Sequence, residues 1–250
     1  MKWLFIFFLS FAPFLCVVSQ DVNTMIKEGD RLESLPDEIA AFHKFREVLK
    51  IQPLNIYALN KCSELCSRIG KRQVTTKAME DYYHAAKTYA GIALKVNPND
   101  AEANCVMAMA LGRSSMARTG KEKIENAKEI KKYIDISLKN DPKNFKALHI
   151  LGRWHYELNN LNMVERAAVK VLYGGLPHAS IKESIAAFEK AKLVAPGFLL
   201  NYLEMAKAYK QNNQKAKAIA YLNTMLSLPN QTEDDPGIKE LGRKMLKDWK

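Results

Sequence analysis

One helix ending recurs four times along this chain, and this repetition limits the possible fold more than any other feature. The segments REVLKIQP, GIALKVNP, DISLKNDP and AKLVAP end at Pro53, Pro98, Pro142 and Pro196. Each is an amphipathic run that stops at a proline, a residue that cannot continue a helix. Repetition of this kind is typical of stacked helical hairpins, in which neighbouring units bury each other's apolar faces.

The stretch from Phe145 to Leu172 contains the clearest single unit. Leu148, Leu151, Gly152 and His155 stand at the positions of the W-x2-L-G-x2-Y signature of a tetratricopeptide repeat. This spacing puts apolar side chains on one helix face and a small residue where the partner helix crosses closely. We therefore expect an all-α, tetratricopeptide-like right-handed superhelix of about five helical hairpins, closed by a C-terminal capping helix.

The proline spacing also sets the expected domain boundaries. Intervals of 45, 44 and 54 residues between the four prolines exceed the roughly 34 residues of a standard repeat, which predicts lengthened helices or insertions. We place one repeat domain at 21–250, with approximate repeats at 22–53, 55–98, 101–142, 145–196 and 199–230 and a cap at 236–249. The fourth repeat holds an insertion at 161–180, whose amphipathic segment VERAAVKVLY stops at Gly174 and Gly175.

The first twenty residues have the composition of a secretory signal. Lys2 precedes the apolar run WLFIFFLSFAPFLCVV, and Ser19, Gln20 and Asp21 follow it. The run has sixteen residues, fewer than the about 20 that a spanning helix needs. We therefore expect a signal peptide at 1–20, a mature chain that begins near Gln20 or Asp21, and export to the periplasm or the extracellular space. The alternative is an uncleaved segment that anchors the protein in a membrane, and only such a segment would give a membrane contact.

The cysteines and histidines do not form a catalytic or metal-binding pattern. Beyond the predicted signal, Cys62, Cys66 and Cys105 form an odd set without disulfide spacing. Cys62 and Cys66 lie one helical turn apart, but no further ligand stands at zinc-site spacing. The five histidines are scattered over different repeats, outside any HExxH or Ser-His-Asp context. The sequence predicts a protein that is not an enzyme and holds neither a metal nor another cofactor.

The net charge indicates the kind of partner. The formal charge is +11, which favours anionic partners, although lysine-rich solvated surfaces account for most charges of this kind. No motif that reads DNA or RNA is present. We expect a monomer that binds an acidic protein or peptide and no nucleic acid.

Candidate binding residues follow from the geometry of the superhelix. The first helix of each hairpin lines the concave face, so the outward template positions of these helices point toward a ligand. Basic and tyrosine side chains recur there and suit a carboxylate or an extended acidic peptide. The candidate groove residues are Tyr57, Arg68, Arg113, His149, Arg153, Tyr156, Lys207 and Lys210. For Arg153 a structural role competes, because it can pair with Glu157 or Glu165.

The second half of the chain resembles the regulator of microtubule dynamics family of tetratricopeptide-like proteins, over roughly residues 100–248. The segments that carry the resemblance are LGRW at Leu151–Trp154, Tyr156-Glu157, Leu161, Glu165-Arg166, Leu172, Pro177, Ala179-Ser180 and AFEKAKLVAPGF up to Phe198. The resemblance implies a helical-repeat fold, association with microtubules, organelle contacts and no catalytic residue. The chain departs from the family in its predicted signal and in Met163, where an aromatic residue is expected. With a genuine signal, tubulin would not be the partner.

These observations predict a non-enzymatic binding scaffold of the regulator of microtubule dynamics-like type. Its basic concave groove would capture an acidic or extended segment of another protein. The alternative is a structural or self-associating envelope or secreted repeat protein that uses its outer face or the inserted helix. Microtubule association would apply only if the N-terminal segment were not a secretion signal.

Overall fold

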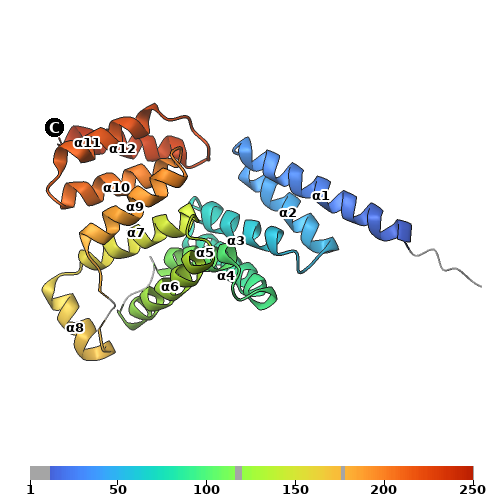
Figure 1. Ribbon diagram of the computed structural model, residues 1–250, viewed down its shortest axis with the longest axis horizontal. Helices are drawn as coiled ribbons and strands as arrows, with labels where there is room; N and C mark the ends of the chain where they lie inside the picture. The colour runs from blue at the N-terminus through green and yellow to red at the C-terminus, as the bar shows by residue number, and fades with distance from the viewer. Residues whose placement is uncertain (1–11, 116–119, 176–177, 250) are drawn as a thin grey trace, which may run out of the picture.

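The computed structural model describes residues 12–115, 120–175 and 178–249. These residues form an all-α stack, and the twelve helices that it describes are α1 (Ala12–Ser34), α2 (Glu38–Ile51), α3 (Ile56–Lys71), α4 (Thr76–Val96), α5 (Ala101–Ser115), α6 (Gly120–Asn140), α7 (Phe145–Asn159), α8 (Met163–Tyr173), α9 (Ile181–Val194), α10 (Leu199–Gln211), α11 (Lys215–Ser227) and α12 (Asp235–Trp249). Figure 1 shows them winding from the α1–α2 hairpin to α11 and α12.

Five helical hairpins and a cap account for the arrangement. The packed partners are α1 with α2, α3 with α4, α5 with α6, α7 with α9, and α10 with α11. The last helix, α12, packs against α10 and α11. The tetratricopeptide-like superhelix with a capping helix that the sequence predicts is therefore confirmed.

Asparagine side chains set where several first helices begin. Asn55 Oδ1 accepts a hydrogen bond from the backbone N–H of Ala58 at 3.0 Å, and Asn144 Oδ1 accepts one from Ala147 at 2.9 Å. Such caps satisfy an N–H group that the first turn of a helix leaves without a partner. Both follow a repeat-ending proline by two residues, so the same short sequence ends one hairpin and starts the next.

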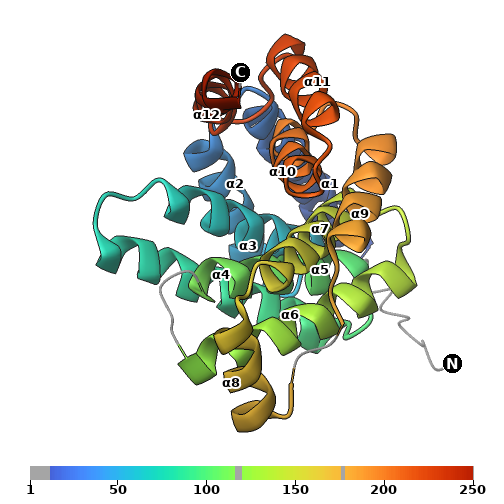
Figure 2. The ribbon, with the colours of Figure 1, turned by 90° about the vertical axis from the view of Figure 1, so that its left-hand side faces the viewer.

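The inserted segment forms a helix of its own. Asn162 and Glu165 form a reciprocal capping box at the start of α8, and Gly174 ends it with a positive φ of 69°, a conformation that glycine adopts without a steric penalty. The predicted amphipathic segment and its glycine stop are thus present. α8 projects from the rest of the molecule in both ribbon views (Figures 1 and 2).

Several glycines permit close approach of helices, and Gly29 and Gly152 do so within two of the hairpins. A Cβ atom on Gly29 would lie 2.7 Å from the Phe45 ring, and one on Gly152 would lie 2.6 Å from the Phe188 ring. Ser184 Oγ also donates a hydrogen bond to the Gly152 carbonyl at 2.7 Å. Gly152 is therefore the contact point between α7 and α9, as its place in the repeat signature predicts.

The first helix starts earlier than the predicted first repeat. α1 begins at Ala12 and continues without a break through Ser19 and Gln20, the predicted cleavage point. Within the described ranges, no helix is both long and apolar enough to span a membrane. Most of the predicted signal, residues 1–11, lies outside the described residues.

Candidate ligand-binding groove

The concave side of the superhelix holds a cavity of about 1250 Å³. Its wall is built mainly by α1, α3, α5, α6 and α7 together with the segments that precede α10 and α12. The apolar part of this wall includes Ile130, Ile150, Trp154, Leu158 and Phe198. The space therefore offers an apolar surface beside charged groups, the usual combination for binding a segment that carries both.

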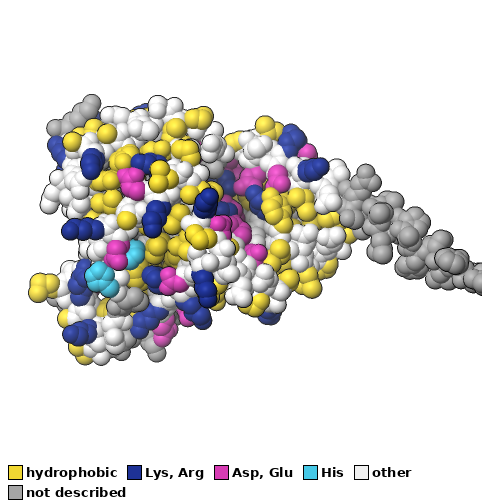
Figure 3. All heavy atoms as spheres, viewed as in Figure 1, with side chains coloured by type: hydrophobic (Ala, Val, Ile, Leu, Met, Phe, Trp, Pro, Cys, Tyr) yellow, Lys and Arg dark blue, Asp and Glu magenta, His cyan; other side chains and the backbone are white. Residues whose placement is uncertain are grey.

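Charged side chains of both signs line this cavity. The basic ones are Lys61, Arg68, Arg113, Lys146 and Arg153, and the acidic ones are Asp30, Glu33, Glu64, Glu157, Asp234 and Asp235. Figure 3 shows acidic and basic side chains gathered in the hollow between the α1–α2 hairpin and the other helices. The concave face is thus more mixed in charge than the sequence predicts, and the pairing of each cation decides its role.

Arg68 is surrounded by carboxylates. Its Nη1 atom donates to Glu33 Oε1 at 2.8 Å, its Nη2 atom donates to Glu38 Oε1, and Glu64 Oε1 lies 3.8 Å from Nη1. Burial disfavours the charged guanidinium, but these three carboxylates outweigh it and raise the pKa of Arg68. Arg72 adds a second cation, with Nη2 at 2.6 Å from Glu38 Oε2. The fully buried Glu38 carboxylate is therefore shared by two arginines.

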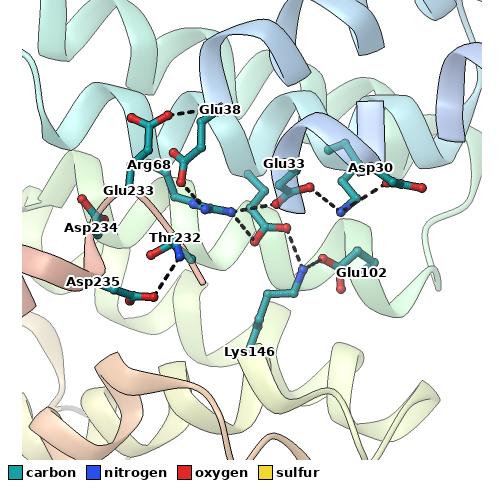
Figure 4. Close-up of polar contacts among 12 residues, drawn as sticks. Asp30, Glu33, Glu38, Arg68, Glu102, Lys146, Thr232, Glu233, Asp234 and Asp235 are labelled. Atoms are coloured by element: carbon teal, nitrogen blue, oxygen red, sulfur yellow. Dashed lines mark hydrogen bonds and ion pairs between the residues drawn. The ribbon is translucent and has the colours of Figure 1, made fainter. Parts of the chain in front are cut away.

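Lys146 connects these contacts to α5 and α7. Its Nζ atom donates to Glu64 Oε2 at 2.7 Å and to Glu102 Oε1 (Figure 4). Burial opposes charge at Glu64, yet Lys146, Arg68 and Lys61 hold the pKa of its carboxyl well below the ordinary value. We call Glu33, Glu38, Glu64, Arg68 and Lys146 the buried ion network. It links α1, α2, α3 and α7, and internal carboxylates occupy its cations.

Arg113 and Arg153 differ from that network. Arg113 forms no hydrogen bond or ion pair with any residue that the structure describes. Burial, followed by the positive charge of Arg153, lowers its pKa, and Tyr83, Asp234 and Glu204 oppose the change only in part. Among the described residues, Arg153 forms an ion pair with Glu157 at 3.4 Å, and the Glu157 side chain is 60% exposed. Against the effect of burial, the charge of Arg153 also helps to lower the pKa of Glu204. We call Arg113 and Arg153 the arginine pair.

His149 lies in the cavity wall but serves packing. Its ring stands 5.0 Å from the Phe198 ring and 5.5 Å from the Phe188 ring. Asn201 Nδ2 donates to the Phe188 carbonyl at 2.9 Å, so its Oδ1 atom accepts a hydrogen bond from His149 Nδ1 at 3.1 Å. Burial, followed by the charge of Arg153, lowers the pKa of His149 to about 4. The ring is therefore neutral at pH 7.

The structure brings five of the eight candidate residues together. Tyr57, Arg68, Arg113, His149 and Arg153 all line the cavity. The Tyr57 hydroxyl donates to Asp30 Oδ1 at 2.5 Å, and burial together with this bond raises its pKa to about 12.

The other three candidates make contacts elsewhere. Tyr156 packs against the core formed by α9, α10 and α11. Lys207 pairs with Glu204 on its own helix at 2.9 Å, and Lys210 lies over the Trp249 ring of the capping helix, 5.8 Å from its centre.

Reasoning from the sequence missed the acidic half of the site. Glu33, Glu38, Glu64 and Glu102 bind the cations of the first helices, and the segment 231–235 joins the wall from the far end of the chain. Glu64 and Arg68 lie one helical turn apart, a spacing at which side chains can pair, so the sequence alone could have indicated this contact. The other contacts join residues far apart in sequence, and no local pattern marks them.

The cysteines and the possible metal ligands are the remaining candidates for a chemical role. Cys62, Cys66 and Cys105 are buried free thiols, and burial raises the pKa of each, which makes a thiol unreactive. Among the described residues no group of three or more histidine, cysteine or acidic side chains is placed to hold a metal ion.

Known structures share this architecture. A thermophilic tetratricopeptide-repeat protein of Thermus thermophilus superimposes with a TM-score of 0.64 over 90% of this chain and 98% of that chain, at 14% identity. At that identity the likeness concerns the fold alone. The fold and the groove define the class: a tetratricopeptide-like helical-repeat scaffold with a concave groove.

Sequence comparison identifies the family within this class. Residues 25–250 match the family described as Regulator of microtubule dynamics protein 1-3, and the chain belongs to that family. The resemblance found in the sequence is thereby confirmed, and it extends to the first two repeats.

Three relatives illustrate the degree of similarity. Regulator of microtubule dynamics protein 3 of Xenopus laevis is 31% identical over 150 residues, which are 60% of this chain and 32% of that protein. Protein 2 of Homo sapiens is 27% identical over 173 residues, 69% of this chain and 42% of that protein. Protein 1 of Bos taurus is 28% identical over 165 residues, which are 66% of this chain and 52% of that protein. The chain thus spans about a third to about half of the length of these relatives.

The comparisons overturn the predicted export. The relatives are named for regulating microtubule dynamics, and microtubules are polymers of the cell interior. The prediction of a periplasmic or extracellular protein is therefore wrong. The physical reason is that an apolar run of sixteen residues indicates only that the segment is hydrophobic. Hydrophobicity alone does not determine where in or outside the cell a protein is located.

Proposed function

We propose that this protein is a binding scaffold whose groove captures an extended acidic segment of a partner protein, with the arginine pair as the anchor. The observation that supports this most is the contrast in pairing: carboxylates of the chain occupy Arg68 and Lys146, whereas Arg113 has no internal partner among the described residues. Two neighbouring cations that repel each other are stabilised by an anion placed between them.

The apolar wall adds a second requirement for the ligand. Ile130, Trp154 and Phe198 line the same cavity as the arginine pair. A segment with carboxylates and apolar side chains in an extended arrangement satisfies both surfaces, and the apolar contacts add affinity that salt does not screen.

The family supports a partner associated with microtubules. Its members are named for regulating microtubule dynamics, and this name, transferred to the present chain, makes tubulin the first partner to test. The correction of the predicted export removes the reason, drawn from the sequence, for setting tubulin aside.

The test uses a short fluorescein-labelled peptide of alternating glutamate and leucine, measured by fluorescence anisotropy. Arg113→Gln/Arg153→Gln should weaken binding at least about tenfold, since each charge-assisted contact contributes roughly 1.5 to 3 kcal/mol. Lys182→Gln/Lys190→Gln removes the same charge from exposed positions of α9 and should change the Kd by less than about twofold. Co-sedimentation of the same variants with assembled microtubules tests the partner.

Equal losses from the two double variants would mean diffuse attraction by the net positive charge, and the groove would not be the binding site. Raising the salt concentration provides a further check, because the wild-type protein should lose affinity only in part when apolar contacts contribute.

Self-association through α8 is a second candidate function. Met163 and Val171 on this projecting helix are 86% and 82% exposed, and exposed apolar side chains of this kind support contact with another chain. Sedimentation velocity over a range of concentrations distinguishes the candidates: a monomer at all concentrations favours the groove, whereas a dimer that Met163→Gln/Val171→Gln abolishes favours α8.

A further inference from the structure

The segment that joins α11 to α12 reaches the first two hairpins, although they lie far away in sequence. Glu233 Oε1 accepts a hydrogen bond from the backbone N–H of Glu38 at 2.7 Å, across 195 residues. Arg72 Nη2 lies 3.1 Å from Glu233 Oε2, and Arg72 Nη1 lies 3.4 Å from Asp234 Oδ1. Lys71 Nζ is 3.3 Å from Asp234 Oδ2. We call Glu233 and Asp234 the acidic clasp.

The segment that carries the clasp has a fixed shape. Asp235 is buried, and its Oδ2 atom accepts hydrogen bonds from the backbone N–H groups of Gln231 at 2.6 Å and Thr232 at 2.8 Å. Figure 4 shows Glu233 pointing toward Glu38, while Asp235 turns back to Thr232. Because Asp235 holds the turn from within, the clasp carboxylates are presented to α2 and α3 without further ordering of the chain.

The contacts of the clasp are polar and partly exposed. α12 packs against α10 and α11, and the side chains of Arg72, Glu233 and Asp234 retain exposures of 25%, 30% and 14%. Ion pairs of this kind are weak and are screened by salt. The closure between the two ends of the superhelix can therefore open without unfolding either end.

The clasp stands at the end of the proposed groove. Asp234 and Asp235 line the same cavity as Arg113, and the negative charge of Asp234 acts on Arg113, where it opposes the effects of burial and of Arg153. An acidic segment that enters the groove thus meets a carboxylate of the chain itself. The clasp also pairs with Lys71 and with Arg72, which in addition remains bound to Glu38.

From this geometry we infer that the acidic clasp is an internal ligand, which closes one end of the groove and competes with an acidic partner segment. This inference rests on the proposed function and adds to it a way in which partner binding is regulated. Partner binding displaces Glu233 and Asp234 from Arg72 and Lys71, and release of the clasp raises the affinity for an acidic segment.

The first measurement follows the clasp itself, without any ligand. Glu38 is the first residue of α2, and its amide donates to the Glu233 carboxylate. Its hydrogen exchange rate in the full chain, measured by NMR, therefore reports whether the clasp is closed. Glu233→Gln/Asp234→Asn should accelerate this exchange at least about fivefold. The matched control Glu240→Gln/Asp248→Asn removes two charges from exposed positions of α12 and should leave the exchange rate unchanged.

The second measurement is the affinity of the same proteins for the labelled peptide of alternating glutamate and leucine. We expect Glu233→Gln/Asp234→Asn to bind this peptide about three- to tenfold more tightly than the wild-type protein. The Glu240→Gln/Asp248→Asn control should remain within about twofold of the wild-type Kd, although it carries the same net charge as the clasp variant.

The outcomes separate the inference from the proposed function. Unchanged Glu38 exchange in the clasp variant, or faster exchange with unchanged or weaker peptide binding, overturns the internal ligand and leaves the groove in place. An equal gain in affinity from the control also overturns it, because net charge would then explain the effect. If neither the wild-type protein nor the clasp variant binds the peptide, the proposed function fails and the competition fails with it, whatever the exchange data show.

Discussion

The cations of the buried ion network and of the arginine pair line one cavity, yet they differ in their internal partners. Arg68 and Lys146 are each held by two or more carboxylates of the chain. Arg113 has no such partner among the described residues, and the effect of Arg153 on it is repulsive. The difference shows that an excess of basic residues does not locate a binding site. A cation marks a candidate site when the fold leaves it without an internal anion.

The contrast also has an energetic side. Removing one partner of a buried pair leaves the other charge without compensation, whereas a cation that lacks a partner leaves nothing behind when it is removed. Substitutions in the buried ion network should therefore affect stability, whereas substitutions in the arginine pair should affect binding. The following substitutions test this division in order of decreasing effect.

The largest effect is expected for Arg68→Met. The substitution removes one of the two arginines that compensate the fully buried Glu38. Breaking a buried pair costs about 3 to 5 kcal/mol, and we expect the lower end because Arg72 remains bound to Glu38. Urea unfolding followed by circular dichroism measures the change.

A surface pair provides the control for Arg68→Met. Arg243 pairs with Glu240 at 3.0 Å with both side chains exposed, and Arg243→Met should cost no more than about 1 kcal/mol. Similar losses from Arg68→Met and Arg243→Met would show that the buried ion network contributes nothing special to the fold.

A smaller effect is expected for Gly152→Leu, which changes the packing residue of α7 that directly precedes Arg153. The new side chain would enter the Phe188 ring, since a Cβ atom alone lies 2.6 Å from it, and overpacking of this kind costs about 1 to 3 kcal/mol. Gly237→Ala is the control, because nothing lies within 4 Å of the added Cβ atom. An unchanged melting curve for Gly152→Leu would mean that α7 and α9 are packed in a different register.

The fold followed from local signals in the sequence. The repeated prolines, the caps at Asn55 and Asn144 and the glycine stop at Gly174 each act within a few residues, so a single sequence shows them. Gly152 was predictable for a related reason, because the repeat signature ties its position to the crossing of the partner helix.

The candidate site was only partly predictable. The period of the first helices placed Arg113 and Arg153 on the concave face, but it could not show which cations are neutralised. That depends on contacts such as Glu38 with Arg68, 30 residues apart, and Glu233 with Glu38, 195 residues apart. Such contacts depend on the curvature of the whole superhelix, and the same property brings the segment before α12 to the first hairpins.

The smallest effect on stability is expected for Arg113→Gln. Burial and the charge of Arg153 both disfavour the Arg113 guanidinium and lower its pKa, so its replacement relieves an unfavourable term while glutamine keeps part of the apolar stem. The free energy of unfolding should change by less than about 0.5 kcal/mol, and a slight increase is the expected direction. The repulsion is electrostatic, so any gain should shrink as the salt concentration rises. Urea unfolding at low and high salt, run beside Arg68→Met, measures both. A loss of more than about 2 kcal/mol at low salt would mean that Arg113 has an internal anion, and the arginine pair would then belong with the buried ion network and could not serve as the anchor of the groove.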